Sequence, residues 1–580
     1  MSALAGRDRL LLTLCAVAVA FAAVDTYVVV LALPDMMTGV KLSAEELNRA
    51  APIVSGFLLG YVAMLPLIGR IADLRGQVPV LGMSLVVFSV GSLVTTVSMD
   101  LPTMVAGRFL QGVGGGGLVP ATMSLVAVLY PVERRGLPLG VVSAVQEFGS
   151  VLGPLFGAAV LAFSSWRGIF AINVAAGVLL AVAVGVLART AEEVEVRGAP
   201  ATSLEPPRDR FDWFGTLALL VTVVAAGTAY VQPGVLQRDL TWGQLFIPYV
   251  EGGGRWVTPI GLIALVALVV LLLRFALAKR PLVDYRGWFA HLVEADLPGA
   301  LLLAAVLGGI VLAFATADPE VAVFSPQGPW FLLGSALAAA VLVVHLRRSP
   351  RPVVPRGALR RTPAWGALVV SFLVGWALIA ALVDVPLFAR TTTQRDSQLG
   401  AALVLLRFLA ALPVGALLGG WLLRRLNAGV LTATGMLAAA TGFFAMGQWG
   451  ATTLDSAWST VPLVVGGFGF GLALAPVNAA MLATTSEDVH GLASALVVVA
   501  RMVGMLVGIS ALTTVGLRRF YSAQEADPDL SLTQLGIVQE HVVFNGAAVV
   551  AVLAAVLAVA LLSPARTRGV DTAEVLRAVG

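Results

Sequence analysis

Residues 135–158 read RGLPLGVVSAVQEFGSVLGPLFGA, and this stretch decides the fold. Its apolar part is long enough to cross a bilayer core as a helix, which takes about 20 residues. Gly149, Gly153 and Gly157 recur at every fourth position, so they fall on one helix face, where glycine lets a second helix approach closely. Pro154 has no backbone N–H group, which permits a bend at that point. The pattern predicts a membrane helix with a close-packed face.

The whole chain has the composition of a membrane protein. Hydrophobic residues make up 58% of its 580 residues and charged residues only 12%, whereas soluble domains carry about 25% charged residues. Apolar runs of helix length fall in three groups, within residues 10–188, 212–346 and 364–563. We count roughly 14 to 16 such runs. The single cysteine, Cys15, lies in the first run, which excludes a disulfide framework and a cysteine-based metal site.

The charges of the loops between these runs predict an orientation. Arginine and lysine gather in alternate loops, of which 347–361 is the most basic. Because basic loops stay in the cytoplasm, both termini are predicted to be cytoplasmic, in a multi-pass protein of the bacterial plasma (inner) membrane. The loop 517–541 is an exception, since it carries Arg518 and Arg519 on the predicted outer side. We expect this segment to extend the two adjoining helices beyond the membrane.

The runs and loops also divide the chain into segments. An N-terminal six-helix bundle is predicted over residues 1–190, a polar cytoplasmic linker over 191–211 and a central block of extra transmembrane helices over 212–350. A C-terminal six-helix bundle follows over 351–566, and residues 567–580 are predicted to be a cytoplasmic tail. The predicted fold class is therefore an all-α membrane protein with two six-helix bundles and a central block of extra helices.

The two predicted bundles share a sequence pattern. Residues 135–137 (Arg-Gly-Leu) correspond to residues 490–492 (His-Gly-Leu), and at the same offset Gly149 corresponds to Gly504. In each copy the next glycine follows four residues later. Glycine at this spacing also recurs in helices by chance, but here several features match at one offset. Two pseudo-symmetric copies of six helices are the plan of the major facilitator superfamily, which the chain resembles.

The loop after the second apolar run resembles the cytoplasmic signature of that superfamily. It reads GRIADLRG over residues 69–76. The resemblance implies a conformational latch formed by Gly69, Asp73, Arg75 and Gly76. In one state only, the Asp73 carboxylate would cap the N-terminus of a neighbouring helix or pair with an arginine. The plainer interpretation is an ordinary loop aspartate.

Further motifs narrow the resemblance. The run at 140–158 is similar to the helix typical of proton-driven exporters, and Asp25-Thr-Tyr is similar to the first helix of fourteen-span drug:proton antiporters. The motif around Arg108 is similar to the fourth helix of the superfamily. Together with Glu147 and residues 490–508, these motifs resemble the mycobacterial exporters of triacylglycerides, which are also linked to drug resistance. That resemblance implies a periplasmic lipoprotein as a partner.

Charged residues inside apolar runs require partners, because an unpaired charge there costs at least about 2.5 kcal/mol. The main candidates are Asp25, Arg108, Glu147 and Arg501, and the weaker ones are Asp384 and Arg407. Glu147 and Arg501 each lie near the middle of their helices, and we expect them to face each other across a central cavity. Asp25 and Arg108 lie nearer the outer face. We predict that Asp25 and Glu147 carry protons and that Arg501 and Arg108 are their ion-pair or gating partners. A static ion pair that fixes helix packing is the alternative.

These features predict proton-coupled export of a triacylglyceride-like or other apolar lipid by alternating access. The alternative is a multidrug/H⁺ antiporter for amphipathic drugs, which an acidic cavity would favour; a scaffold or receptor that transports nothing is a third interpretation. We expect protons and membrane lipids as partners, and no enzymatic activity, nucleic acid, metal or cofactor. The aromatic loop 232–256 is expected at the membrane interface or on a partner.

Overall fold

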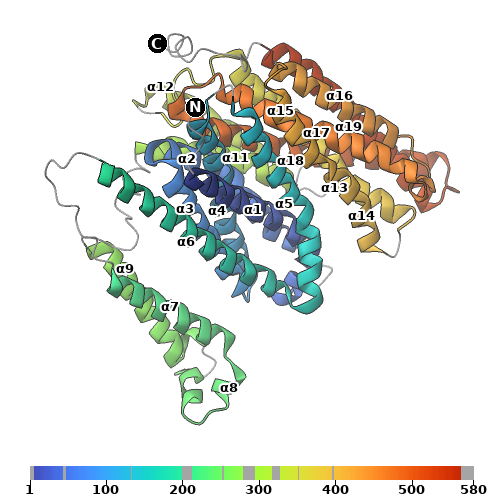
Figure 1. Cartoon of the computed structure of the whole chain (residues 1–580). Helices are drawn as coiled ribbons and strands as arrows, with labels where there is room; N and C mark the ends of the chain where they lie inside the picture. Colours follow the sequence, from blue (N-terminus) through green and yellow to red (C-terminus); the bar gives the residue numbers. More distant parts are fainter. Residues whose placement is uncertain are drawn as a thin grey trace. The chain divides into compact units, whose positions relative to one another are not determined.

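A computed structural model describes the chain except for residues 1–5, 43–46, 132–133, 199–211, 251–253, 279–293, 316–326, 351, 395–396 and 564–580. The described residues form helices and no strand (Figure 1). They divide into two compact units, one of Met1–Val194 with Ala295–Gly580 and one of Glu195–Glu294.

The N-terminal helices of the first unit form a bundle around a continuous apolar core. They are α1 (Gly6–Gly39), α2 (Leu47–Arg75), α3 (Gln77–Thr96), α4 (Leu101–Leu129), α5 (Gly136–Phe163) and α6 (Trp166–Gly198). The Asp100 side chain caps α4 by accepting the Thr103 N–H at 2.9 Å. Phe57, Leu118 and Val126 lie in the core of this bundle.

The C-terminal helices repeat that plan. They are α13 (Thr362–Thr391), α14 (Gln398–Leu409), α15 (Ala411–Leu422), α16 (Ala428–Met446), α17 (Thr460–Leu482), α18 (His490–Ala526) and α19 (Leu532–Leu562). The helices α14 and α15 meet at Ala410 and together make one candidate span, Gly400–Leu422. Packed phenylalanine rings, among them Phe408, Phe443 and Phe544, fill the core.

The fold class is confirmed. Fourteen described helices are long and apolar enough to cross a membrane, and α1 and α5 add shorter described apolar stretches, Leu10–Asp25 and Gly136–Gln146. The predicted extension of the helices through 517–541 is also present, because α18 continues to Ala526 and α19 begins at Leu532. At 37 residues, α18 is far longer than the roughly 20 residues that a bilayer core requires.

Glycine contacts repeat between the two bundles. A Cβ atom on Gly149 of α5 would collide with the carbonyl oxygen of Ala20 on α1. In the second bundle, a Cβ atom on Gly504 or Gly508 of α18 would likewise collide with the carbonyl oxygen of Phe372 or Trp376 on α13. Helix pairs α1–α5 and α13–α18 therefore pack backbone to backbone, as the glycine pattern predicted.

Two extra helices belong to the first unit, α11 (Leu297–Ala315) and α12 (Gly328–Arg348). The helix α11 packs along α2 and also contacts α18. Asp296, which precedes α11, fixes its start: the Asp296 carboxylate lies 2.7 Å from His345 Nε2 and accepts the Val353 N–H at 2.9 Å. The helix α11 thus covers the seam between α2 and α18, and α12 packs on α11.

The second unit contains a helical hairpin made of α7 (Trp213–Val231) and α9 (Pro259–Leu277), joined by α8 (Gly234–Gln237) and two 3₁₀ turns. Arg274 of α9 pairs with Asp212 at 3.1 Å. The connecting loop exposes Trp242 and Tyr249 and buries Phe246. In that loop the backbone N–H groups of Trp242 and Thr241 donate to Asp239 and lower the pKa of its carboxyl group. The predicted central block is therefore shared between the two units.

We name the two ends of the first unit by its helices. The latch end is where α2 ends at Arg75 and α18 begins at His490. The tip end is where α18 ends at Ala526 and α19 begins at Leu532.

Candidate functional site

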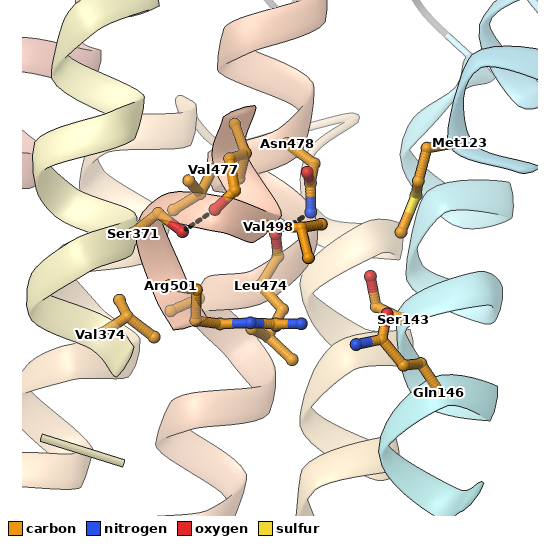
Figure 2. A pocket seen from close by; sticks show the side chains of 12 residues that line it. Met123, Ser143, Gln146, Ser371, Val374, Leu474, Val477, Asn478, Val498 and Arg501 are labelled. Atoms are coloured by element: carbon orange, nitrogen blue, oxygen red, sulfur yellow. Dashed lines mark hydrogen bonds between the residues drawn. The ribbon is translucent and has the colours of Figure 1, made fainter. Parts of the chain in front are cut away.

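A cavity lies between the two bundles, lined by side chains of α4, α5, α13, α17 and α18 (Figure 2). In this conformation the free space within the cavity is about 20 Å³, which is room for roughly one water molecule and not for a lipid. Much of the wall is apolar, with Met123, Leu474 and Val498 among its residues. None of the residues that line the cavity in the described structure is acidic.

The polar part of the wall centres on Arg501. This residue is 9% exposed and lies 11 residues after the start of α18, about 16 Å along the helix axis. In Figure 2 its guanidinium group extends across the cavity toward Gln146 of α5. Asn478 of α17 donates to the Leu474 carbonyl at 3.1 Å, while its own buried Oδ1 atom accepts no hydrogen bond from the described residues. The cavity therefore presents a cation and hydrogen-bonding groups within an apolar wall.

The predicted partner of Arg501 was Glu147. Glu147 lies in α5 directly after Gln146, but its side chain falls outside the described part of the structure. Arg501 lines the cavity, as the sequence suggested, and the facing of Glu147 and Arg501 stays a prediction.

Asp25 and Arg108 lie together inside the N-terminal bundle. Arg108 of α4 donates to the Asp25 carboxylate of α1 at 2.8 Å, and the two side chains are 1% and 0% exposed. Asn173 of α6 also donates to Asp25. A buried charge pair is stable only when its remaining hydrogen-bonding capacity is satisfied, and this network does so across three helices.

The surroundings of Arg108 hold the guanidinium group in place. Besides the bond to Asp25, Arg108 donates to Gln111 Oε1 at 2.9 Å and to the Ile53 carbonyl oxygen at 3.3 Å. The Phe57 ring lies under the guanidinium carbon at 4.5 Å from its centroid, a cation–π contact. Gln111 donates in turn to Ser92 of α3 at 2.8 Å. Arg108 thus connects side chains of at least four helices.

The latch residues join the two bundles. The Asp73 carboxylate accepts the backbone N–H groups of Gly491 at 2.6 Å and Leu492 at 3.1 Å, so it caps the N-terminus of α18. A Cβ atom on Gly69 would lie 2.6 Å from the Gly491 carbonyl oxygen, so α2 and α18 cross in close contact. Gly76 has a φ of 94°, which glycine adopts without strain, and it follows Arg75 at the end of α2.

Comparison with known proteins agrees with this geometry. The sequence profile of the Major Facilitator Superfamily matches residues 15–293 and 287–509. The chain belongs to the Major Facilitator Superfamily. It is 33% identical over 514 residues to a protein named triacylglyceride transporter from Mycolicibacterium hassiacum, covering 87% of this chain and 78% of that protein.

Two further comparisons extend this result. A protein named triacylglyceride transporter from Mycobacterium tuberculosis is 32% identical over 532 residues, covering 89% of this chain and 84% of the relative. The crystal structure of the human organic anion transporter MFSD10 shares the fold, with a TM-score of 0.56 and 12% identity over 95% of this chain and 99% of that one. Family and relatives mark the chain as a membrane transporter.

A second seam lies at the latch end, between α5 and α15. A Cβ atom on Gly136 would lie 2.5 Å from the Gly420 carbonyl oxygen, so the seam is as close as the first. No side chain caps the start of α5 from the preceding residue, Arg135. Arg135 instead donates to the carbonyl oxygens of Ala127 and Tyr130. The backbones approach equally closely in both seams, but among the described residues an acidic side chain caps the helix start only in the first, where Asp73 caps α18.

Sequence reasoning missed several polar residues of this superfamily member. Gln111 lies one helical turn after Arg108, so its spacing was a usable signal. Asn173 and Asn478 are isolated amides in apolar helices, and nothing in their sequence neighbourhood connects them to Asp25 or to a cavity.

Proposed function

We propose that the chain exports a triacylglyceride-like lipid from the bacterial plasma membrane by alternating access coupled to proton influx. The observation that carries the proposal is the cavity between the bundles, whose wall combines apolar side chains with Arg501 and uncharged polar groups. Such a wall suits the acyl chains of a lipid and the ester oxygens of its glycerol backbone. The names of the mycobacterial relatives support the same cargo class.

The names of the mycobacterial relatives favour a lipid over the alternative cargo, amphipathic cationic drugs. We assign the route from the bilayer to the seam between α5 and α15, because α11 covers the seam between α2 and α18.

Asp25 and Glu147 are the proposed proton carriers. In this conformation Arg108 neutralises Asp25, so proton binding at Asp25 requires that the pair first separate. A change in the tilt of α1 against α4 would do so, because the two groups belong to different helices. Arg501 is the proposed partner of Glu147 in the cavity. Protonation of Asp25 and opening of the transporter are then linked, because both require α1 to move against α4.

The Asp73 contact supplies the proposed gate. In the described state it holds the latch end shut, because it joins α2 of one bundle to α18 of the other. We assign the latch end to the cytoplasm, in line with its basic loops, and place both termini there. Loss of the cap would favour opening toward that side.

We also propose that a periplasmic lipoprotein receives the cargo at the tip end. The motivation is the projection of α18 and α19 beyond the length that a bilayer requires. The test is capture of the purified lipoprotein by the full chain and by a variant in which Arg518 and Arg519 are replaced by glutamine. Equal capture by both would contradict docking on this segment.

A photoreactive triacylglyceride analogue tests the cargo assignment in proteoliposomes. The proposal predicts labelling of peptides that line the cavity, and a loss of labelling in Leu474→Trp, which fills the space. Leu437→Trp is the matched control, because Leu437 lies on the outer face of α16 and is 49% exposed. Labelling confined to outer faces, or unchanged in Leu474→Trp, would contradict a lipid site in the cavity.

A further inference from the structure

Two buried carboxyl groups lie in the C-terminal bundle, away from the cavity. Asp384 of α13 is 3% exposed and Glu540 of α19 is 1% exposed. Asp384 lies seven residues before the end of α13, roughly 10 Å along that helix, and Glu540 lies eight residues after the start of α19, roughly 12 Å from the tip end. Neither residue belongs to the cavity or to the latch.

The two side chains lie within hydrogen-bonding reach of each other. Gln539 donates a hydrogen bond to Glu540 Oε1 at 3.3 Å. The other carboxyl oxygen, Glu540 Oε2, is buried and accepts no hydrogen bond from the described residues. Two carboxylates have only acceptor atoms, so a hydrogen bond between them exists only when one carries a proton. The group that is missing from this contact is therefore a proton.

The charged groups on the surrounding helices are occupied elsewhere or exposed. On α19, His541 contacts the Trp449 carbonyl through its ring nitrogen, and on α14 Arg407 donates to the Thr460 hydroxyl. On α13 and α18, Arg390 and Arg518 are exposed, as is Arg519 beside the latter. Arg501 lines the central cavity, and α16 and α17 contain no charged residue. No described cation pairs with Asp384 or Glu540.

We propose that Asp384 and Glu540 form a proton-binding site in the C-terminal bundle, in which one proton bridges the two carboxyl groups. Two ionised carboxylates in contact and without a cation would repel each other in a low-dielectric interior, so binding one proton converts a pair of charge −2 into one of charge −1. We assign the exchange of this proton to the tip end, because Glu540 lies roughly 12 Å from the start of α19. The site takes no cargo and is separate from Asp25, Arg108 and Glu147.

Infrared difference spectroscopy of the purified full chain tests this site through the carbonyl stretch of a protonated carboxyl group. At neutral pH the wild type should show a protonated-carboxyl band, and Asp384→Asn and Glu540→Gln should each lose the component that the pair contributes. Both variants keep a group of similar size that can hydrogen bond to the remaining carboxylate. Asp529→Asn, on the exposed turn before α19, is the matched control and should keep the full band.

Glu540→Asp, which retains the acid, should restore the band. The proposal is overturned if the band is unchanged in both amide variants, or if the wild type shows no protonated carboxyl group at neutral pH. The second criterion applies even where a variant fails to fold. Because no cargo or gradient is used, the result is independent of whether Asp25 and Glu147 drive transport.

Discussion

Each bundle buries an acidic residue on its first helix, but the two bundles surround it differently. Asp25 lies on the first helix of the N-terminal bundle and contacts Asn173 of the sixth, with Arg108 as its counter-charge. Asp384 lies on the first helix of the C-terminal bundle and meets Glu540 of the sixth, without a described cation. One bundle therefore fixes its aspartate by charge neutralisation, whereas the other leaves an acid pair that only a proton can join.

The same asymmetry appears at the latch end. Asp73 of α2 caps α18, whereas the corresponding end of α15 is followed by Arg424 and Arg425, which cannot accept the N–H groups of α5. Glycine contacts are alike in both seams. Backbone packing therefore carries the repeat of the fold, and side-chain charge distinguishes the halves in function.

Removing Arg108 should have the largest effect on stability. Arg108→Met leaves Asp25 buried without its cation, which should lower the free energy of unfolding by about 3–5 kcal/mol. Thermal unfolding in detergent measures the change. Asp384→Asn should change stability by at most about 1 kcal/mol, because it removes no ion pair.

Arg407→Met is the matched control for Arg108→Met, since Arg407 is partly buried and its one described hydrogen bond is to the neutral Thr460 hydroxyl. Equal stability of Arg108→Met and the wild type would show that the Asp25–Arg108 pair is no more important than the acid pair.

Filling the repeated glycine contacts should have the next largest effect, and it should be similar in both bundles. Gly149→Val and Gly504→Val each force a side chain against a carbonyl oxygen of the neighbouring helix, at a cost of about 1–3 kcal/mol. Gly185→Val in α6 is the control, because nothing lies within 4 Å of its added Cβ atom. Thermal unfolding again gives the comparison, and a loss confined to one bundle would break the proposed equivalence.

Releasing the latch should shift conformation more than stability. Asp73→Ala removes the cap of α18, a change of about 1 kcal/mol, or roughly fivefold in the ratio of closed to open states. Spin labels on Arg134→Cys and Arg424→Cys, which flank the seam between α5 and α15, report the distance in a Cys15→Ala background. Glu487→Ala is the control, because it removes only a 3.7 Å contact between an exposed carboxylate and Arg135 at this end and leaves the cap of α18 in place. An unchanged distance distribution in Asp73→Ala would remove the latch from the mechanism.

Much of the architecture could be predicted from the sequence because membrane helices leave a long apolar signal. The apolar runs, the glycine pattern of 140–158 and the repeat at 490–508 reflect constraints that act within one helix or one helix pair. The Asp25–Arg108 contact could also be predicted, because few charges lie in apolar runs and each requires a partner. Asp73 caps α18, one of the contacts that the family resemblance implied, and its role as a conformational latch stays a prediction.

The rest depends on contacts between distant helices. Glu540 lies in the extended start of α19, where the sequence looked like part of an outer loop, so its burial against Asp384 had no local signal. Gln146 and Asn478 reach the cavity from α5 and α17, and single amides of this kind are common in helices that line nothing. The division of the extra helices between two units likewise follows from packing, because 212–231 and 297–316 are equally apolar in sequence.

Gradient-driven lipid transfer in proteoliposomes tests proton-coupled export most directly. The readout is the movement of a fluorescent triacylglyceride analogue under an imposed pH gradient, with and without a protonophore. We predict that wild-type transfer depends on the gradient and that Asp25→Asn and Glu147→Gln each abolish that dependence while remaining folded. Asp35→Asn, an exposed residue of the same helix as Asp25, should transfer lipid normally. Full gradient-driven transfer in both Asp25→Asn and Glu147→Gln would contradict the account.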